Sequence, residues 1–288
     1  MSAAAASVDI DESVVVIGPP GTELVGVLAR PAEERAAKAV GVVIVVGGPQ
    51  TRVGSHRQFV LMARALARAG YPCLRFDYAG MGDSPGPRPD FERAGPDIRR
   101  ACDALMTAAP GCTRLALWGL CDGATAALFH AATDERIAAV VAANPWARSD
   151  ATRSAALVVD HYGSRLRSAE FWKKLFSGRI DVLGAAREAF GHLMRARSRP
   201  PASNGALAGE GLPARLARAL AAPREAVRLQ LSGRDLTATE FEMAMGKTGI
   251  LQRTSATTLR LEEADHTFSA PVNWQTAIDD TVSTLARL

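Results

Sequence analysis

A cysteine stands between two glycines in the segment Gly119-Leu120-Cys121-Asp122-Gly123. The apolar run before it, Arg114–Trp118, is typical of a buried β-strand, and the small residues after it favour a helix that packs closely on its neighbours. Where a strand turns directly into a helix, the two backbones approach closely, and glycine is the residue that tolerates such an approach. The segment therefore predicts a sharp turn that presents Cys121 at the end of a strand.

Strand and helix patterns alternate on both sides of this turn and predict an α/β fold with a mostly parallel, doubly wound sheet. The segments 14–17 and 24–28, separated by Gly18-Pro19-Pro20-Gly21, predict an N-terminal antiparallel hairpin. The remaining predicted strands are 40–46, 71–76, 114–118, 137–143, 227–231 and 257–261, and the predicted helices include 56–69, 97–108, 238–245 and 272–288.

The alternation stops between residues 147 and 222, where the sequence is helical and irregular. A loose segment rich in Pro, Ser, Asn and Gly lies near residues 199–205. We therefore expect residues 147–222 to form a helical cap inserted into one core domain of residues 1–146 and 223–288.

Composition excludes several classes of protein. The 288 residues carry a formal charge of +4, but the basic residues are scattered, which argues against nucleic-acid binding. No apolar window is long enough to span a bilayer and no signal peptide is evident, so we predict a cytoplasmic location. Four cysteines without a C-x-x-C pair are expected to be free thiols, and no motif for a metal or other cofactor is present.

Three residues with complementary chemistry follow three predicted strands. Cys121 comes first, Asp235 follows strand 227–231, and His266 follows strand 257–261. Because the carboxyl ends of parallel strands meet at one edge of a sheet, we expect these side chains to lie close together. A nucleophile, a histidine that moves protons and an acid that orients the histidine are the parts that acyl transfer needs.

Over essentially its whole length the chain resembles the α/β-hydrolases, in which nucleophile, acid and histidine occur in this order. More narrowly, four segments resemble the exosortase A system-associated hydrolases, a bacterial group with a cysteine nucleophile. These segments are Gly47-Gly48-Pro49-Gln50 with Val53-Gly54-Ser55-His56-Arg57, Phe76–Ser84, Leu117–Gly123 and Leu231–Thr237. The resemblance implies the fold and a Cys-His-Asp triad more firmly than a substrate. Dienelactone hydrolases also use cysteine in this fold.

Alternatives remain for two members of the triad. Asp150, soon after the predicted strand 137–143, is a second candidate for the acid of the triad. Asp265 is too near His266 in sequence to reach the far nitrogen of its ring. Another histidine, His56, begins the first predicted helix, where it either caps that helix or touches substrate. The other histidines lie in the predicted cap or behind the turn: His130, His161 and His192.

An oxyanion hole requires two N–H donors beside the nucleophile. We expect one from the backbone of Asp122 and one from the loop after Val46, where Pro49 has no N–H to offer. By the resemblance, Val46 replaces the histidine of the H-G-x-P pattern. That leaves Gly48 as a backbone donor and Gln50 as a side-chain helper, and without the histidine the choice between Gly48 and Gln50 stays open. Trp146 and Trp172, like His56, are candidates for substrate contact.

The chemistry of sulfur sets the functional prediction. A nearby histidine and a helix N-terminus both favour a thiolate, which attacks a carbonyl carbon and forms a thioester. The sequence therefore predicts a hydrolase of esters, thioesters or lactones acting on a small acyl substrate, free or linked to a carrier or coenzyme A. An acyltransferase or cyclase that passes the acyl group to an amine or hydroxyl is the alternative. A non-catalytic binding protein on the same fold is a third possibility.

Overall fold

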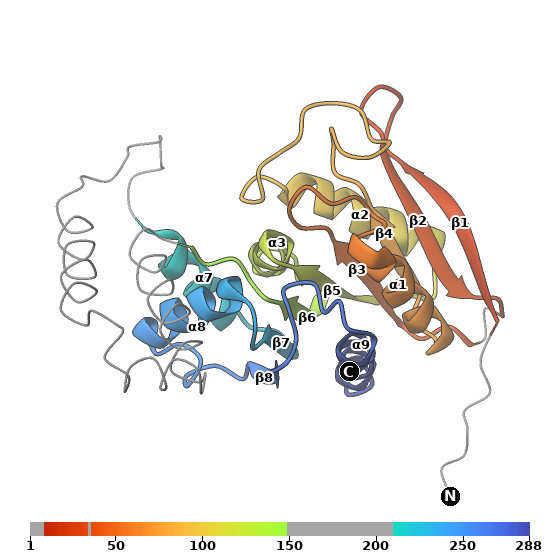
Figure 1. The fold of residues 1–288 in the computed structure, drawn as a ribbon. Helices are drawn as coiled ribbons and strands as arrows, with labels where there is room; N and C mark the ends of the chain where they lie inside the picture. The colour runs from red at the N-terminus through yellow and green to blue at the C-terminus, as the bar shows by residue number, and fades with distance from the viewer. Residues whose placement is uncertain (1–8, 34–35, 149–209) are drawn as a thin grey trace, which may run out of the picture.

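One sheet of eight strands, in the order β1-β2-β4-β3-β5-β6-β7-β8, organises the computed structural model, which describes residues 9–33, 36–148 and 210–288 (Figure 1). Strand β1 pairs antiparallel with β2 and β2 with β4, whereas every other neighbouring pair is parallel. The predicted mostly parallel sheet with an N-terminal hairpin is confirmed. The strands are β1 (Ile10–Ile17), β2 (Leu24–Pro31), β3 (Val40–Val45), β4 (Cys73–Phe76), β5 (Arg114–Leu120), β6 (Ile137–Ala143), β7 (Ala226–Ser232) and β8 (Thr257–Leu261).

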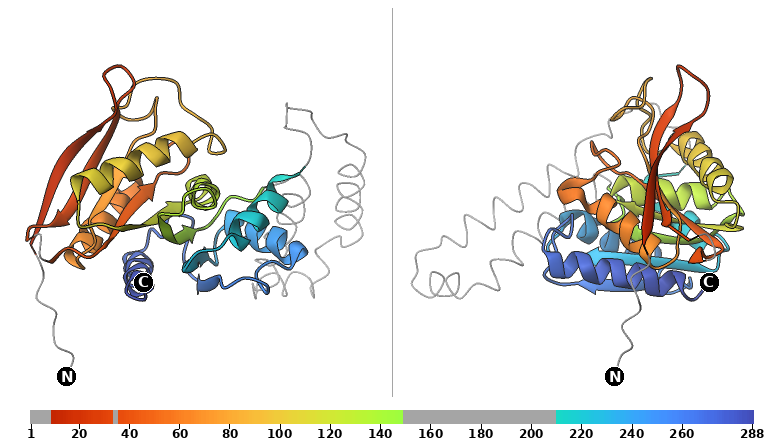
Figure 2. Two further views of the ribbon diagram at one scale, coloured as in Figure 1. Left: turned by 180° about the vertical axis from the view of Figure 1, so that it is seen from behind. Right: turned by 90° about the vertical axis from the view of Figure 1, so that its right-hand side faces the viewer.

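Helices cover both faces of the sheet, as a doubly wound fold requires. Helices α1 and α9 pack together on one face, and α2 and α3 pack together on the other (Figure 2). Helix α7 contacts α3 and α8. The described α-helices are α1 (Gln58–Arg68), α2 (Gly95–Ala108), α3 (Asp122–Ala131), α7 (Leu212–Ala221), α8 (Leu236–Thr248) and α9 (Pro271–Leu285).

All four helices with predicted bounds are present, and each begins or ends one to three residues from the predicted position; local structure explains the differences in α1 and α8. The predicted helix 56–69 starts at Gln58, because His56 and Arg57 have φ angles of 54° and 58° in a 3₁₀ turn, η2 (Ser55–Arg57). Helix α8 extends beyond the predicted 238–245, because the Asp235 carboxylate accepts hydrogen bonds from its first turn. Its far end is set by Gly249, at a φ of 64°.

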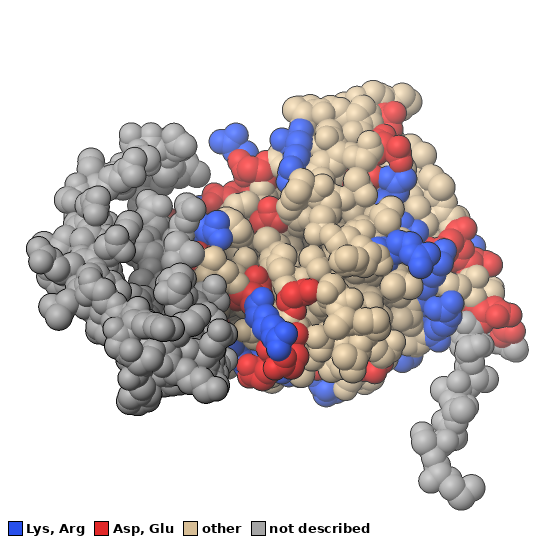
Figure 3. All heavy atoms as spheres, in the orientation of Figure 1, with Lys and Arg blue, Asp and Glu red and all other residues tan. Residues whose placement is uncertain are grey.

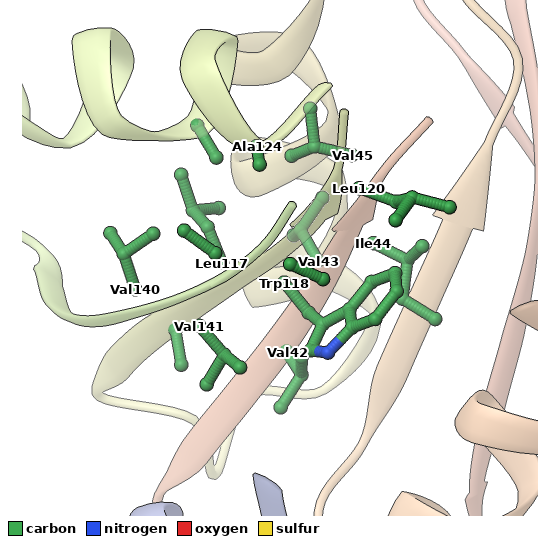
Figure 4. Packing of buried hydrophobic residues seen from close by; sticks show 14 of the residues in the cluster. Val42, Val43, Ile44, Val45, Leu117, Trp118, Leu120, Ala124, Val140 and Val141 are labelled. Carbon is green, nitrogen blue, oxygen red and sulfur yellow. The ribbon is translucent and has the colours of Figure 1, made fainter. Parts of the chain in front are cut away.

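The core forms around the central strands β3 and β5. Every residue of β3 is buried, as its uninterrupted apolar run predicts for a strand covered on both faces. Trp118 of β5 is fully buried and makes edge-to-face contacts with Phe59 of α1 and Trp274 of α9, each at 5.9 Å between ring centroids. Figure 4 shows Trp118 on the opposite side of β5 from Ala124 of α3. The packing on both faces fixes β5 and the turn that follows it.

Charged side chains of both signs are interspersed on the face of the molecule seen in Figure 3. None of the described helices combines the length and apolar character that a membrane crossing needs. Most of the predicted cap, residues 149–209, lies outside the described residues. The cap boundaries at 147 and 222 therefore stay a prediction.

Candidate active site

The turn at Cys121 has the sharp geometry that the glycines predict. Cys121 lies between the end of β5 and the start of α3, with φ 61° and ψ −128°, a region that residues with a side chain rarely adopt. Its N–H donates to the Ala143 carbonyl at 2.9 Å, and its own carbonyl accepts from the Trp146 N–H at 3.1 Å. These bonds to the end of β6 hold the backbone in its strained conformation.

Close backbone approach accounts for the two glycines of the turn. A Cβ on Gly119 would lie 2.6 Å from the Gly123 carbonyl oxygen, and a Cβ on Gly123 would lie 2.6 Å from the Val45 carbonyl oxygen. Real Cβ atoms essentially never come this near to another heavy atom. The turn is therefore packed against the end of β3 with no room for side chains at these positions.

The strand order places this turn at the crevice of the sheet. From β3 the chain first passes to β4 on one side and then to β5 on the other side of β3. Loops that leave neighbouring strands in opposite directions open a crevice at the carboxyl ends of those strands, where open α/β sheets bind ligands. Cys121 after β5 and Gly47-Gly48 after β3 both lie at this point.

His266 and Asp235 meet directly. The Nδ1 atom of His266 lies 2.9 Å from Oδ2 of Asp235, whose side chain is 7% exposed. Asp235 also accepts hydrogen bonds from the N–H groups of Thr237 (3.2 Å) and Ala238 (3.1 Å), which fix the carboxylate at the start of α8. The structure thus brings together the acid and the histidine that the sequence predicts.

Two further carboxylates, those of Asp265 and Asp150, come into question as the acid of the triad. The Asp265 carboxylate accepts hydrogen bonds from the N–H groups of Thr267 (3.1 Å) and Ser269 (2.9 Å), so it stabilises its own turn. Asp150 lies outside the described residues.

The electrostatics of His266 connect it to Cys121 as well. Burial lowers the pKa of the ring, but hydrogen bonds to Asp235 and Cys121 and the charges of both outweigh burial and raise the pKa to about 10. The ring therefore carries a proton at neutral pH. A half-buried imidazolium that is bonded to the Asp235 carboxylate and interacts with Cys121 can give a proton to a leaving group.

The other three cysteines differ from Cys121 in exposure. Cys73, Cys102 and Cys112 are buried, whereas Cys121 is half-buried. Burial raises the pKa of all three buried thiols, to about 12 for Cys102 and about 11 for Cys112. The thiolate is the reactive form of cysteine. Burial and a raised pKa therefore both keep these three thiols from reacting with reagents in solution.

We expect iodoacetamide to label the native protein once, on Cys121, within the time that labels all four thiols after unfolding. Intact-mass analysis followed by peptide mapping measures both numbers. The native Cys121→Ala variant is the control and should take up no label. Equal labelling of a buried thiol in the native wild-type protein would contradict the expected selectivity.

The predicted oxyanion donors lie together, with one unexpected contact. The Gly48 N–H donates to the side chain of Asp122, with 2.5 Å between N and Oδ1. In this structure that N–H is occupied, and a substrate oxyanion has to displace the carboxylate to reach it. The Asp122 N–H belongs to the first residue of α3, at the positive end of the helix dipole. Oε1 of Gln50 accepts from the Ser55 N–H (3.4 Å) and from Nε2 of Gln58 (3.1 Å).

The predicted substrate contacts have different positions. Trp146 is half-buried beside the turn, and the Arg148 guanidinium, paired with Glu240, stacks over its ring at 4.3 Å. His56 is exposed, and it does not cap α1, because the N-cap residue is Arg57 and no side chain caps that helix. Trp172 and the two cap histidines at 161 and 192 lie outside the described residues.

Two residues near His266 are absent from the predicted site. Asn144 at the end of β6 and Ser232 at the end of β7 are buried, and both hydrogen-bond the backbone around His266. An asparagine followed by proline at the end of a strand predicts a turn but no such partner. Among the described residues, no three His, Cys, Asp or Glu side chains come together as metal ligands would.

Fold and sequence define the class of this protein. Residues 42–279 match the alpha/beta hydrolase family, so the chain belongs to that family, and the predicted α/β-hydrolase fold is confirmed. Family membership identifies a hydrolase-type enzyme.

Solved structures with the same fold include two hydrolases. An esterase from Pyrococcus furiosus is 16% identical with a TM-score of 0.64, over 96% of this chain and 91% of the esterase. A dienelactone hydrolase from Anabaena variabilis is 16% identical with a TM-score of 0.60, over 96% of this chain and 98% of the other. At such low identity the likeness concerns the fold alone. No curated protein matches the chain in sequence.

Proposed function

We propose that this enzyme is a cysteine-dependent acyl hydrolase in which Cys121 is the nucleophile, His266 the general acid and base, and Asp235 the residue that orients His266. The observation that carries the proposal is the contact between His266 and Asp235, with 2.9 Å between Nδ1 of His266 and Oδ2 of Asp235, together with the interaction of Cys121 with the same ring, which helps to raise its pKa. The motifs shared with the exosortase A system-associated hydrolases support the same triad, and we propose membership of that group.

In the first step the Cys121 thiolate attacks the acyl carbonyl carbon. The charge that develops on the carbonyl oxygen is stabilised by the Asp122 N–H at the start of α3. As the tetrahedral intermediate collapses, the bond to the leaving oxygen or sulfur breaks, and the His266 imidazolium donates its proton to that atom. A neutral alcohol or thiol departs and a thioester remains on Cys121.

The second step reverses these roles. Neutral His266 takes a proton from water while the water oxygen attacks the thioester carbonyl. The C–S bond then breaks, which releases the acid and restores the thiolate and the imidazolium. Because thioesters also react readily with amines, an amine or hydroxyl acceptor in place of water makes the enzyme an acyltransferase or cyclase.

Esters, thioesters and lactones are the substrates that suit this site. Each has a carbonyl that a thiolate attacks and a leaving group that a single proton from His266 converts into a neutral product. The esterase and the dienelactone hydrolase among the structural neighbours are named for substrates of this kind. The half-buried Trp146 beside the turn offers apolar surface for the acyl group.

The test is intact-mass analysis after incubation with a panel of activated esters and acyl thioesters. We expect wild-type protein to gain the mass of the acyl group on Cys121 and the Cys121→Ala variant to gain nothing. Faster release of the adduct by amines than by water at matched concentration would favour transfer over hydrolysis. If no adduct forms on Cys121 while substrate is still consumed equally by both proteins, the proposal is wrong.

A further inference from the structure

Asn144 occupies an unusual position at the end of β6. Its side chain is fully buried, and its φ of 43° lies in the left-handed region, which asparagine tolerates better than most residues. Its N–H donates to the Gln230 carbonyl at 2.9 Å, which continues the pairing of β6 with β7. A buried side-chain amide here needs partners, because an unpaired one is costly.

Those partners lie on β7 and on the loop after β8. Nδ2 of Asn144 donates to Oγ of Ser232 at 2.9 Å and to the His266 carbonyl at 3.0 Å. Oδ1 of Asn144 accepts from the Ser232 N–H at 2.8 Å. Both N–H bonds of the amide group and its oxygen are therefore used.

Ser232 completes the arrangement. Its hydroxyl donates to the Asp265 carbonyl at 2.8 Å, so two consecutive carbonyls, those of Asp265 and His266, are held from the ends of β7 and β6. Ser232 is 1% exposed and Asn144 fully buried, so the side-chain ends of these bonds are shielded from water.

These two residues also lie close in sequence to the rest of the proposed triad. Ser232 is the last residue of β7 and precedes Asp235 by three residues. Asn144 precedes Trp146 by two residues, and the Trp146 N–H bonds the Cys121 carbonyl. The two side chains thus join the segments that bear Asp235 and His266, and the backbone bond of Trp146 joins the segment of Asn144 to Cys121.

We propose that Asn144 and Ser232 are positioning residues that fix the backbone of His266 so that its ring reaches both Asp235 and Cys121. This inference rests on the proposed function for its catalytic meaning. The loop from β8 to α9 carries His266, and small errors in the position of a catalytic group reduce rates strongly: a displacement of about 1 Å can cost about 10²-fold.

The test compares Asn144→Gly and Ser232→Ala with a matched control. Glycine adopts the left-handed conformation freely, so Asn144→Gly removes the amide without adding backbone strain. We expect kcat to fall about 10- to 100-fold in this variant while KM changes little, because the ring moves and the acyl site does not. Ser232→Ala removes the bond to the Asp265 carbonyl and the bond from Nδ2 of Asn144, but it leaves the bond from Asn144 to the His266 carbonyl. It should show a smaller loss in the same direction.

Gln230→Leu is the control. Gln230 is on the same strand and fully buried, and its Nε2 donates to the Ala277 carbonyl, to Asp280 and to Thr281, none of them in the His266 loop. We expect a lower melting temperature in Gln230→Leu but wild-type kcat. A general loss of core stability would instead lower kcat in all three variants in proportion to their melting temperatures.

A second readout does not depend on turnover. The pH profile of Cys121 alkylation reports the pairing of the thiolate with the imidazolium, and it should shift in Asn144→Gly and Ser232→Ala but not in Gln230→Leu. Wild-type kcat and a wild-type alkylation profile in folded Asn144→Gly would overturn the proposal.

If Asn144→Gly does not fold, the same result in Ser232→Ala decides against the positioning role. If wild-type protein alkylates normally but forms no acyl adduct, the proposed function fails, and the alkylation profiles still decide the positioning role.

Discussion

Replacement of His266 by asparagine is expected to lower kcat/KM by about 10³-fold. Asparagine is of similar size and still hydrogen-bonds to Asp235, but it neither accepts nor donates a proton in the pH range of the reaction. Both steps of the proposed mechanism lose their proton carrier, and the thiolate loses its cationic neighbour. Steady-state kinetics on the ester that gives the Cys121 adduct, with burst amplitudes for acylation, measures the loss.

The pH dependence of the acylation rate in the wild-type enzyme should reflect the titration of the His266 ring. Hydrogen bonds to Asp235 and Cys121 prevail over burial and raise the pKa of His266 to about 10. The imidazolium needed for acylation is thus present at neutral pH, and the acylation rate should fall only as the pH rises through about 10. A rate that falls between pH 6 and 7, near the ordinary histidine pKa of ~6.5, would contradict the assigned role.

Stability should follow the same titration. Because the pKa of His266 is higher in the folded protein than the ordinary 6.5, the ring stabilises the fold fully below pH 6.5. This contribution is lost as the pH rises through about 10. The free energies of unfolding of wild type and His266→Asn should therefore converge at alkaline pH.

Glu263→Gln is a suitable control for these measurements. Glu263 lies in the same loop as His266, but its carboxylate is exposed and pairs with Arg234. Its removal changes the charge of the loop without touching the triad. We expect near-wild-type kcat/KM and an unchanged alkaline limb, because an exposed ion pair contributes little.

Much of the site follows from local sequence. Glycines on both sides of Cys121 require a close backbone approach, and the end of a parallel strand is where such folds place their catalytic groups. Asp235 and His266 are predictable for the same reason, because an acid and a histidine follow the last two strands in the order that an acyl-transfer triad requires. The structure brings Asp235 and His266 into contact at 2.9 Å, as this pattern predicts.

The remaining contacts depend on chain segments that meet only in three dimensions. Asn144 is predicted merely as a turn residue, because its partner carbonyl at His266 is 122 positions away. The bond from the Gly48 N–H to the Asp122 carboxylate likewise joins loops that are 74 positions apart. In η2, the left-handed conformations of His56 and Arg57 oppose the helical periodicity, so the predicted start of the first helix is wrong.

The second large effect is expected at Gly47, where the loop after β3 meets the turn at Cys121. A Cβ at this position would overlap the Leu120 carbonyl oxygen and lie 2.9 Å from the Gly123 nitrogen. Both neighbours are backbone atoms of the turn around Cys121, so neither can swing aside as a side chain does. We expect Gly47→Ala to lose about 3 kcal/mol of stability, or roughly 5–10 °C in melting temperature.

The activity of Gly47→Ala should fall by more than the increase in unfolded protein explains. To admit the methyl group, the loop that carries Gly48 has to move away from the turn, and this widens the gap between Gly48 and the Asp122 N–H where the oxyanion is expected. Kinetics at a temperature where Gly47→Ala is fully folded separates this effect from unfolding.

The matched control is Gly246→Ala in α8, where a Cβ meets nothing within 4 Å. Alanine favours the helix at that exposed position and should stabilise the protein by about 0.5 kcal/mol with unchanged kcat. Wild-type stability and activity in Gly47→Ala would mean that the loop and the turn are not packed together, and the close approach inferred for this fold would be wrong.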